Sequence, residues 1–506
     1  MTLSRFTLKN LPEGKVQNVP DGIFELPEKV LQFGTGVLLR GLPDYFIDKA
    51  NRQGIFNGRI VVVKSTGGGD AAPFEKQDGL YTLCIRGLEE GKTISENIIC
   101  SAISRVLSAK EEWSTILKCA HNPEMEIIIS NTTEVGIELV QDDIHHHPPI
   151  SYPGKLLSFL YERYKAFDGS DQCGMVIVPT ELISDNGKKL EAIVLELAHL
   201  NGLEENFIEW LEKYNHFCNS LVDRIVPGKP DTAAKKILEE QLGYKDDLIT
   251  MSEVYSLWAI EGDEKIAGVL SFAEAHKGVV ITQDINLFKE LKLRLLNGTH
   301  SLTCGVAFLS GIVSVKEAMD NKLISNFVND LMCNEIAKAI PYNLPEDDAV
   351  DFAGKVLDRF RNPSIEHHWI NISLNFTAKL EMRIVPVLLR YAELYKTYPE
   401  NVALGFAAYL VFMKAVKQED DVFYGNFNAS SYPIKDPKAK YFYEQWKNYS
   451  TPQVIKNVLA NTSLWNTDLT AIPGFAEKVT RNVEDILNYG MKEVLNGATI
   501  ATIEST

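Results

Sequence analysis

The chain lacks most features that mark secreted, membrane or nucleic-acid-binding proteins. Its seven cysteines are scattered over 506 residues without a Cys-x-x-Cys pair, which is the usage of a reducing cytosol. It has no stretch of 18 uncharged apolar residues and no signal-peptide core after Met1, so we expect a cytoplasmic protein with no membrane partner. Basic residues are fewer than acidic ones, and the resulting net charge of -17 argues against a nucleic-acid partner.

Motifs for two classes of enzyme are missing as well. No Gly-x4-Gly-Lys-Ser/Thr run is present, which argues against a P-loop kinase. The histidines at 145–147 stand before two prolines without the ligand spacing of a zinc site, and three consecutive histidines cannot all point at one ion. We interpret them as a solvated loop and expect no metal.

What is present indicates an α/β protein. Short apolar runs at 30–33, 59–64 and 126–130 are separated by amphipathic stretches, and this alternation is typical of a parallel, doubly wound sheet. Farther along the chain, strand signals fade and long amphipathic segments follow. The sequence therefore predicts a Rossmann-like dinucleotide-binding domain at 1–282, followed by an all-helical substrate and catalytic domain at 283–506.

A glycine turn ends the first apolar run. Gly34 and Gly36 are typical of a first βα unit whose backbone approaches a pyrophosphate. The third glycine of the usual fingerprint is replaced by Leu39, so the local pattern also fits an ordinary turn. After the second run, Lys64 and Ser65 stand where an acidic residue would hold the ribose. These residues therefore do not decide whether the cofactor is NAD or NADP.

Polar residues also follow the run at 126–130. Such positions lie at the carboxyl edge of the sheet, where doubly wound folds bind ligands. The residues that we predict to contact the cofactor are Phe33, Gly34, Thr35, Gly36, Arg40, Lys64, Thr132, Thr133 and Glu134.

The spacing Lys292-x4-Asn297-x2-His300 is the most informative feature of the second half. At about 100° per helical residue, the three side chains fall within an arc of roughly 140°. Such a face offers a proton-transfer amine and two groups that can hold an oxygen gaining charge, as a polyol oxidoreductase requires. The same residues also fit a surface lysine, a capping asparagine beside Gly298 and a hydrogen-bonded core histidine.

Together these motifs resemble the mannitol dehydrogenase family of metal-independent, long-chain polyol dehydrogenases. The resemblance implies NAD as cofactor, Lys292 as the general acid/base, and Asn297 and His300 as the groups that bind and polarise the reacting oxygen. The motifs that carry it are 33–40, 131–136, Pro153-Gly-Lys155, Asn186-Gly187 and Lys292-x4-Asn297-x2-His300.

One motif resembles a particular branch of that family. The run Pro179-Thr180-Glu181-Leu182 replaces the Cys-Asp-Asn of sugar-alcohol members and is similar to the branch that reduces tagaturonate. The branch implies a keto-hexuronate or aldonate substrate, whose carboxylate needs cations. We expect Lys379, His367 and Arg383 to contact that substrate, together with Glu181, which either binds a hydroxyl or pairs with Lys292.

Other substrates stay open at this stage. Within the same class, the pairs fructuronate and mannonate, or fructose and mannitol, are alternatives. From a different class, the histidine clusters leave a metal-dependent hexuronate isomerase or dehydratase as an alternative.

Overall fold

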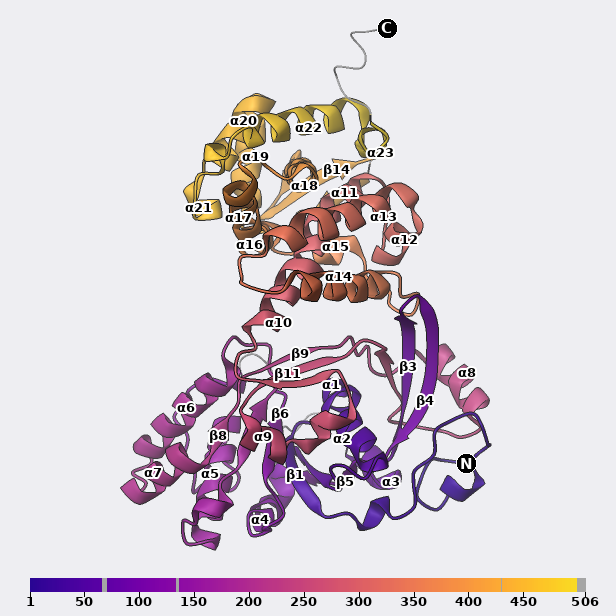
Figure 1. Cartoon of the computed structure of the whole chain (residues 1–506), viewed down its shortest axis with the longest axis vertical. Coiled ribbons are helices and arrows are strands. Elements are labelled where there is room, and N and C mark those ends of the chain that lie inside the picture. Colours follow the sequence, from indigo (N-terminus) through magenta and orange to yellow (C-terminus); the bar gives the residue numbers. More distant parts are fainter. Residues whose placement is uncertain (66–70, 133–135, 429, 498–506) are drawn as a thin grey trace. The chain divides into compact units, whose positions relative to one another are not determined.

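The chain folds into two compact units in the computed structural model (Figure 1). The structure describes residues 1–65, 71–132, 136–428 and 430–497. Unit 1 comprises residues 1–87 and 93–285, and unit 2 comprises residues 88–92 and 286–506. Within the described ranges, every helix is too short or too polar to cross a membrane.

A parallel sheet with the strand order β5-β2-β1-β6-β7-β8 forms the centre of unit 1. The order runs outward from β1 in both directions, as in a doubly wound dinucleotide-binding fold. Strands form here because the runs are short, rich in Ile and Val, and buried on both faces. The strands are β1 (Glu28–Phe33), β2 (Arg59–Lys64), β5 (Ile103–Ser108), β6 (Ile127–Ser130), β7 (Val176–Pro179) and β8 (His216–Phe217).

Helices cover both faces of this sheet. On one face, Leu31 and Phe33 of β1 pack with α4 (Ala109–Cys119), α5 (Tyr152–Ala166), α6 (Asn186–Leu200) and α7 (Glu205–Tyr214). On the other face, Val30 packs with α1 (Val37–Gly41) and α2 (Pro43–Arg52). Alternate residues of one strand thus enter two different cores, which is the period-2 pattern of a strand. The doubly wound fold predicted from the sequence is confirmed.

Smaller sheets complete unit 1. Strands β10 (Thr250–Glu253), β3 (Tyr81–Glu89) and β4 (Lys92–Cys100) form one of them. Strands β12 (Val279–Thr282), β11 (Leu257–Glu261) and β9 (Ser220–Asp223) form another. The remaining α-helices of the unit are α3 (Ala72–Lys76), α8 (Thr232–Leu242) and α9 (Glu264–Val269).

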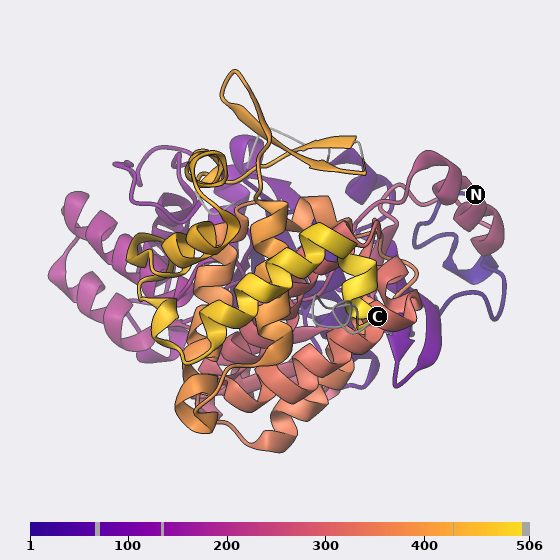
Figure 2. The same ribbon diagram turned by 90° about the horizontal axis from the view of Figure 1, so that it is seen from above.

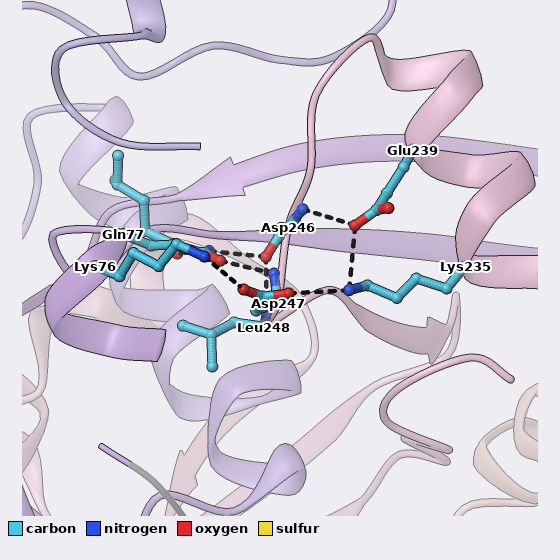
Figure 3. Close-up of polar contacts among 8 residues, drawn as sticks. Lys76, Gln77, Lys235, Glu239, Asp246, Asp247 and Leu248 are labelled. Atoms are coloured by element: carbon cyan, nitrogen blue, oxygen red, sulfur yellow. Dashed lines mark hydrogen bonds and ion pairs between the residues drawn. The ribbon is translucent and has the colours of Figure 1, made fainter. Parts of the chain in front are cut away.

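A buried polar network ties α3 and α8 to the loop before β10 (Figure 3). The Gln77 side chain donates to Asp246 at 2.8 Å and accepts from the Asp247 amide at 2.7 Å. Lys235 of α8 donates to Asp247 at 3.1 Å. These bonds hold the end of α3 against the loop before β10.

Unit 2 is helical, as expected, apart from a small antiparallel sheet that the prediction did not include. This sheet contains β13 (Lys417–Glu419), β14 (Val422–Phe427) and β15 (Ser430–Pro433), coloured orange in Figure 2. The helices are α10 (Asn286–Leu291), the π-helix η6 (Lys292–Gly298), α11 (Thr299–Leu309), α12 (Val315–Asp320), α13 (Lys322–Asn329), the π-helix η7 (Asp330–Ile336), the short η8 (Ala337–Ala339), α14 (Glu346–Phe360), α15 (Trp369–Ile372), α16 (Phe376–Arg383), α17 (Val385–Tyr395), α18 (Glu400–Phe412), α19 (Ala439–Asn448), α20 (Thr451–Leu459), α21 (Thr462–Trp465), α22 (Phe475–Tyr489) and α23 (Met491–Leu495).

Candidate active site

The glycine turn lies where the strand order reverses, between the carboxyl ends of β1 and β6. Gly34 has a φ of 126°, and a Cβ there would lie 2.9 Å from Leu39 Cδ1 and 3.0 Å from the Asn131 carbonyl oxygen. Only glycine fits this position. Gly36 is exposed, and no described atom lies within 4 Å of the place where its Cβ would be. The turn therefore presents bare backbone at the switch point, where such sheets bind dinucleotides.

Two residues that we predicted as cofactor contacts support this turn from inside the unit. The buried Arg40 guanidinium donates to the Thr35 carbonyl at 2.9 Å and to the Thr250 hydroxyl at 3.1 Å. The Phe33 ring is fully buried against Tyr152, with ring centroids 5.2 Å apart. Gly34, Thr35 and Gly36 form the accessible part of the turn.

The other predicted cofactor residues lie at neighbouring strand ends. Lys64 is half-buried and is the last residue of β2. Thr132 follows β6, and its backbone and hydroxyl groups both contact Glu181. Thr133 and Glu134 lie outside the described residues.

Glu181 is buried at the carboxyl end of β7. Its carboxylate accepts hydrogen bonds from the Ser130 hydroxyl at 3.1 Å, the Thr132 amide at 2.8 Å and the Thr132 hydroxyl at 3.0 Å. Both carboxylate oxygens thus accept hydrogen bonds from Ser130, the last residue of β6, and from Thr132. From the sequence we expected Glu181 to bind a substrate hydroxyl or to pair with Lys292. In the structure its carboxylate is hydrogen-bonded to Ser130 and Thr132 of its own unit.

The segment with Lys292, Asn297 and His300 is helical, but it is not a regular α-helix. Residues 292–298 form a π-helix that runs directly into α11. The expected arc at about 100° per residue is therefore wrong. Because a π-helix joins residues i and i+5, Lys292 and Asn297 stand one wide turn apart, both partly exposed. Single π-helical turns inside α-helices are frequent at functional sites.

Contacts with α16 hold this π-helix in place. The Arg383 guanidinium donates to the Asn297 carbonyl at 3.2 Å and to the Ser301 hydroxyl at 2.9 Å. From the π-helix, Arg294 donates to the Arg383 carbonyl at 3.0 Å. A Cβ at Gly298 would lie 3.0 Å from the Ile384 side chain, so glycine permits the close approach. The Asn297 carbonyl, near the end of the wide turn, thereby gains a donor from α16.

His300 lies in an aromatic setting that sequence reasoning missed. Its ring stacks on Phe360 with centroids 4.2 Å apart and an interplanar angle of 10°, and it meets the edges of His367 and Trp369 at 5.3 and 6.0 Å. Its buried Nε2 has no hydrogen-bond partner among the described residues. Burial, and then the neighbouring His367 and cations, hold the pKa of His300 well below its ordinary value. The imidazole is therefore neutral near pH 7 and keeps one nitrogen available for a ligand.

Cations surround this histidine. Lys379 donates to the Ile372 carbonyl at 2.7 Å, and the partners of Arg383 are carbonyl and hydroxyl oxygens. Neither side chain has a carboxylate partner in the described part of the chain. Burial, and then the charge of Arg383, lower the pKa of Lys379; burial lowers that of Arg383 to about 10. Because burial disfavours both positive charges and no carboxylate of the described residues pairs with them, an anion would be favoured here.

His367 belongs to the same cluster. Burial, followed by the charge of Lys379, lowers its pKa. The structure thus brings together four predicted site residues of unit 2: His300, His367, Lys379 and Arg383. Phe360 and Trp369 were recognisable only as aromatic residues beside the basic and histidine clusters of the sequence.

Comparisons with known proteins show the family of the chain. Residues 28–273 match the mannitol dehydrogenase Rossmann domain, and residues 284–487 match the mannitol dehydrogenase C-terminal domain. The chain belongs to the mannitol dehydrogenase family. It is accordingly an oxidoreductase that acts on CH-OH groups, and the glycine turn belongs to a dinucleotide-binding domain.

Relatives within the family span nearly the whole chain. The chain is 37% identical to the altronate oxidoreductase of Bacillus subtilis over 483 residues, which is 95% of this chain and 97% of that protein. It is also 37% identical to the altronate oxidoreductase of Escherichia coli O6:K15:H31 over 481 residues, 93% of this chain and 97% of that protein.

Solved structures share the fold at lower identity. The Pseudomonas fluorescens mannitol 2-dehydrogenase, in a ternary complex with NAD and D-mannitol, superposes with a TM-score of 0.67 and 22% identity, covering 98% of this chain and 99% of that chain. A D-sorbitol dehydrogenase in substrate-free form gives a TM-score of 0.78 and 21% identity, covering 98% of this chain and 100% of that chain.

Proposed function

We propose that this family member catalyses the reversible, NAD-dependent reduction of D-tagaturonate to D-altronate. The observation that carries the proposal is the pair of cations, Lys379 and Arg383, which lie near His300 and donate to carbonyl and hydroxyl oxygens and to no carboxylate of the described residues. A hexuronate carries a carboxylate that must meet a cation or a set of N–H donors when it leaves water. The names of the relatives at 37% identity support the same choice.

The residues of the glycine turn fit a dinucleotide. Gly34 lets the backbone pass close to Asn131, and Gly36 leaves open room in front of the turn, as approach of a pyrophosphate requires. When bound, NADH supplies the hydride for reduction and NAD accepts it in oxidation. Because Lys64 stands where an acidic residue would hold the ribose, NADP is the alternative cofactor to be tested.

Lys292 is the proton-transfer group of the proposal. In reduction its ammonium gives a proton to the carbonyl oxygen, and in oxidation its amine takes the proton from the hydroxyl. The Asn297 amide, one π-helical turn away, and the neutral His300 hold this oxygen and a neighbouring hydroxyl. Preoriented donors are favourable because the oxygen gains negative charge as hydride arrives.

His367, Lys379 and Arg383 hold the far end of the substrate in this scheme. Lys379 and Arg383 meet the carboxylate, and His367 adds a neutral hydrogen-bonding group beside them. Because Lys379 and Arg383 are half-buried and act on His300, their charge is screened less than at an open surface.

The proposal is tested by initial rates of NADH oxidation with tagaturonate, fructuronate and fructose, each repeated with NADPH and with a metal chelator. We expect the highest kcat/KM for tagaturonate with NADH, a much lower value for the uncharged fructose, and no loss with chelator. A preference for fructuronate would move the assignment to the other uronate pair. Turnover without nicotinamide that stops with chelator would replace the proposal with an isomerase or dehydratase.

A further inference from the structure

Glu181 is a buried carboxylate to which the proposed chemistry gives no role. It is 2% exposed and follows β7 by two residues. Its own backbone is fixed, because its carbonyl accepts hydrogen bonds from the Ile183 amide at 2.8 Å and the Asn186 side chain at 3.0 Å. A carboxylate held this firmly at one strand end can in turn fix the neighbouring strand end.

The segment it holds, residues 130–132, forms one side of the switch point. The Asn131 amide donates to the Phe33 carbonyl at 3.1 Å, and the Asn131 carbonyl is the atom that a Cβ at Gly34 would approach to 3.0 Å. The Asn131 side chain donates to the Thr180 hydroxyl at 3.0 Å. The position of this segment therefore sets how much room the glycine turn has.

We infer that Glu181 is a positioning residue for the cofactor: its carboxylate holds residues 130–132 against the glycine turn and so shapes the dinucleotide site. This inference rests on the proposed function only in taking the turn as the nicotinamide-cofactor site. It differs from a role in binding substrate, because all three donors to the carboxylate belong to the last residue of β6 and to Thr132 just after it.

The chemistry of these three hydrogen bonds explains why an acid suits position 181. A carboxylate is an acceptor only and can take up several donors at once, and hydrogen bonds to a charged acceptor are stronger than neutral ones. Glutamine at 181 keeps the length of the side chain and can still accept from the Thr132 amide, while its own amide donates to the Ser130 hydroxyl, which can turn to accept. Leucine removes every acceptor and leaves the Thr132 amide without its partner.

The test compares Glu181→Leu, Glu181→Gln and Ser130→Ala with the wild type, and Glu196→Leu serves as a control at an exposed glutamate of α6. The dissociation constant for NADH is measured by fluorescence titration, and kcat and the KM for the keto acid are measured at saturating NADH. We expect Glu181→Leu to weaken NADH binding about tenfold or more. Glu181→Gln and Ser130→Ala should weaken it by only a few fold, and none of the three should change the keto-acid KM.

Outcomes separate this inference from the proposed function. If the wild type binds NADH and Glu181→Leu binds it equally well, the inference is overturned while the proposed function stands. An altered keto-acid KM with unchanged NADH affinity would also overturn it and would return Glu181 to the substrate. No NADH binding by the wild type would overturn the proposed function itself. Should Glu181→Leu fail to fold, Ser130→Ala decides: unchanged NADH affinity in that variant refutes the inference.

Discussion

Asp44 gives the sharpest prediction, because it is a fully buried acid. It lies in the first turn of α2, just behind the glycine turn. Burial raises its pKa from the ordinary 3.8 to about 8, although the Arg40 guanidinium opposes the shift. The folded protein therefore carries Asp44 as a neutral acid near pH 7.

Stability must then depend on pH through this residue. Between pH 3.8 and about 8, the folded state holds a proton that the unfolded chain has released. Each unit of pH rise in this window lowers the free energy of unfolding by about 1.4 kcal/mol, and the dependence vanishes above the folded-state pKa. Over the whole window the loss is on the order of 5 kcal/mol, a large share of the stability of a typical domain.

The perturbation is Asp44→Asn, which keeps the shape of the side chain and cannot ionise. Urea unfolding at pH 5, 6, 7, 8 and 9 gives the stability of each protein, and the control is Asp21→Asn at an exposed position. We expect the difference between wild type and Asp44→Asn to fall by about 1.4 kcal/mol per pH unit up to pH 8 and then to level off. A difference that stays constant over this range would refute the reasoning, since all other titrating groups are common to both proteins.

Further predictions concern the site itself. Lys292→Ala should lower kcat about 100-fold or more while the dissociation constant for NADH stays nearly unchanged; weakened NADH binding with unchanged turnover at saturation would contradict the role of Lys292. Lys379→Met should raise the KM for tagaturonate about tenfold and leave the KM for fructose unchanged, and an equal rise for both substrates would argue against a carboxylate contact. Gly34→Ala should abolish measurable NADH binding and lower the midpoint of thermal unfolding, because alanine at φ 126° is strained and its Cβ would meet Leu39 and Asn131; full NADH affinity in this variant would show that the turn is not the cofactor site.

Part of the candidate site was predictable from local rules. The glycine turn could be recognised because a short, buried apolar run followed by two glycines requires little beyond local geometry. The cations at 379 and 383 could be selected because a uronate needs them. The π-helix could not be predicted, since its wide turn is stabilised by the carbonyl and hydroxyl contacts of Arg383 and Arg294, which depend on the packing of α16.

The small sheet of unit 2 and the partners of Glu181 also lay beyond the sequence. The strands β13 and β15 are short and mostly polar, and β14 is interrupted by Gly425 and Asn426, so the three segments give only a weak hydrophobic alternation. For Glu181, residue type and position indicated a carboxylate near a strand end. Which donors it meets was decided by the pairing of β6 with β7.

The sequence by itself determined the fold class, the family and the residue types of the candidate site, because periodicity, glycine conformation and motif spacing are properties of neighbouring residues. Tertiary structure alone decided that Arg40 bonds to Thr250, that Glu181 accepts hydrogen bonds from Ser130 and Thr132, and that Phe360 lies against His300. These contacts join positions that are far apart in the chain, and their charge and hydrogen bonding take effect only when folding removes them from water.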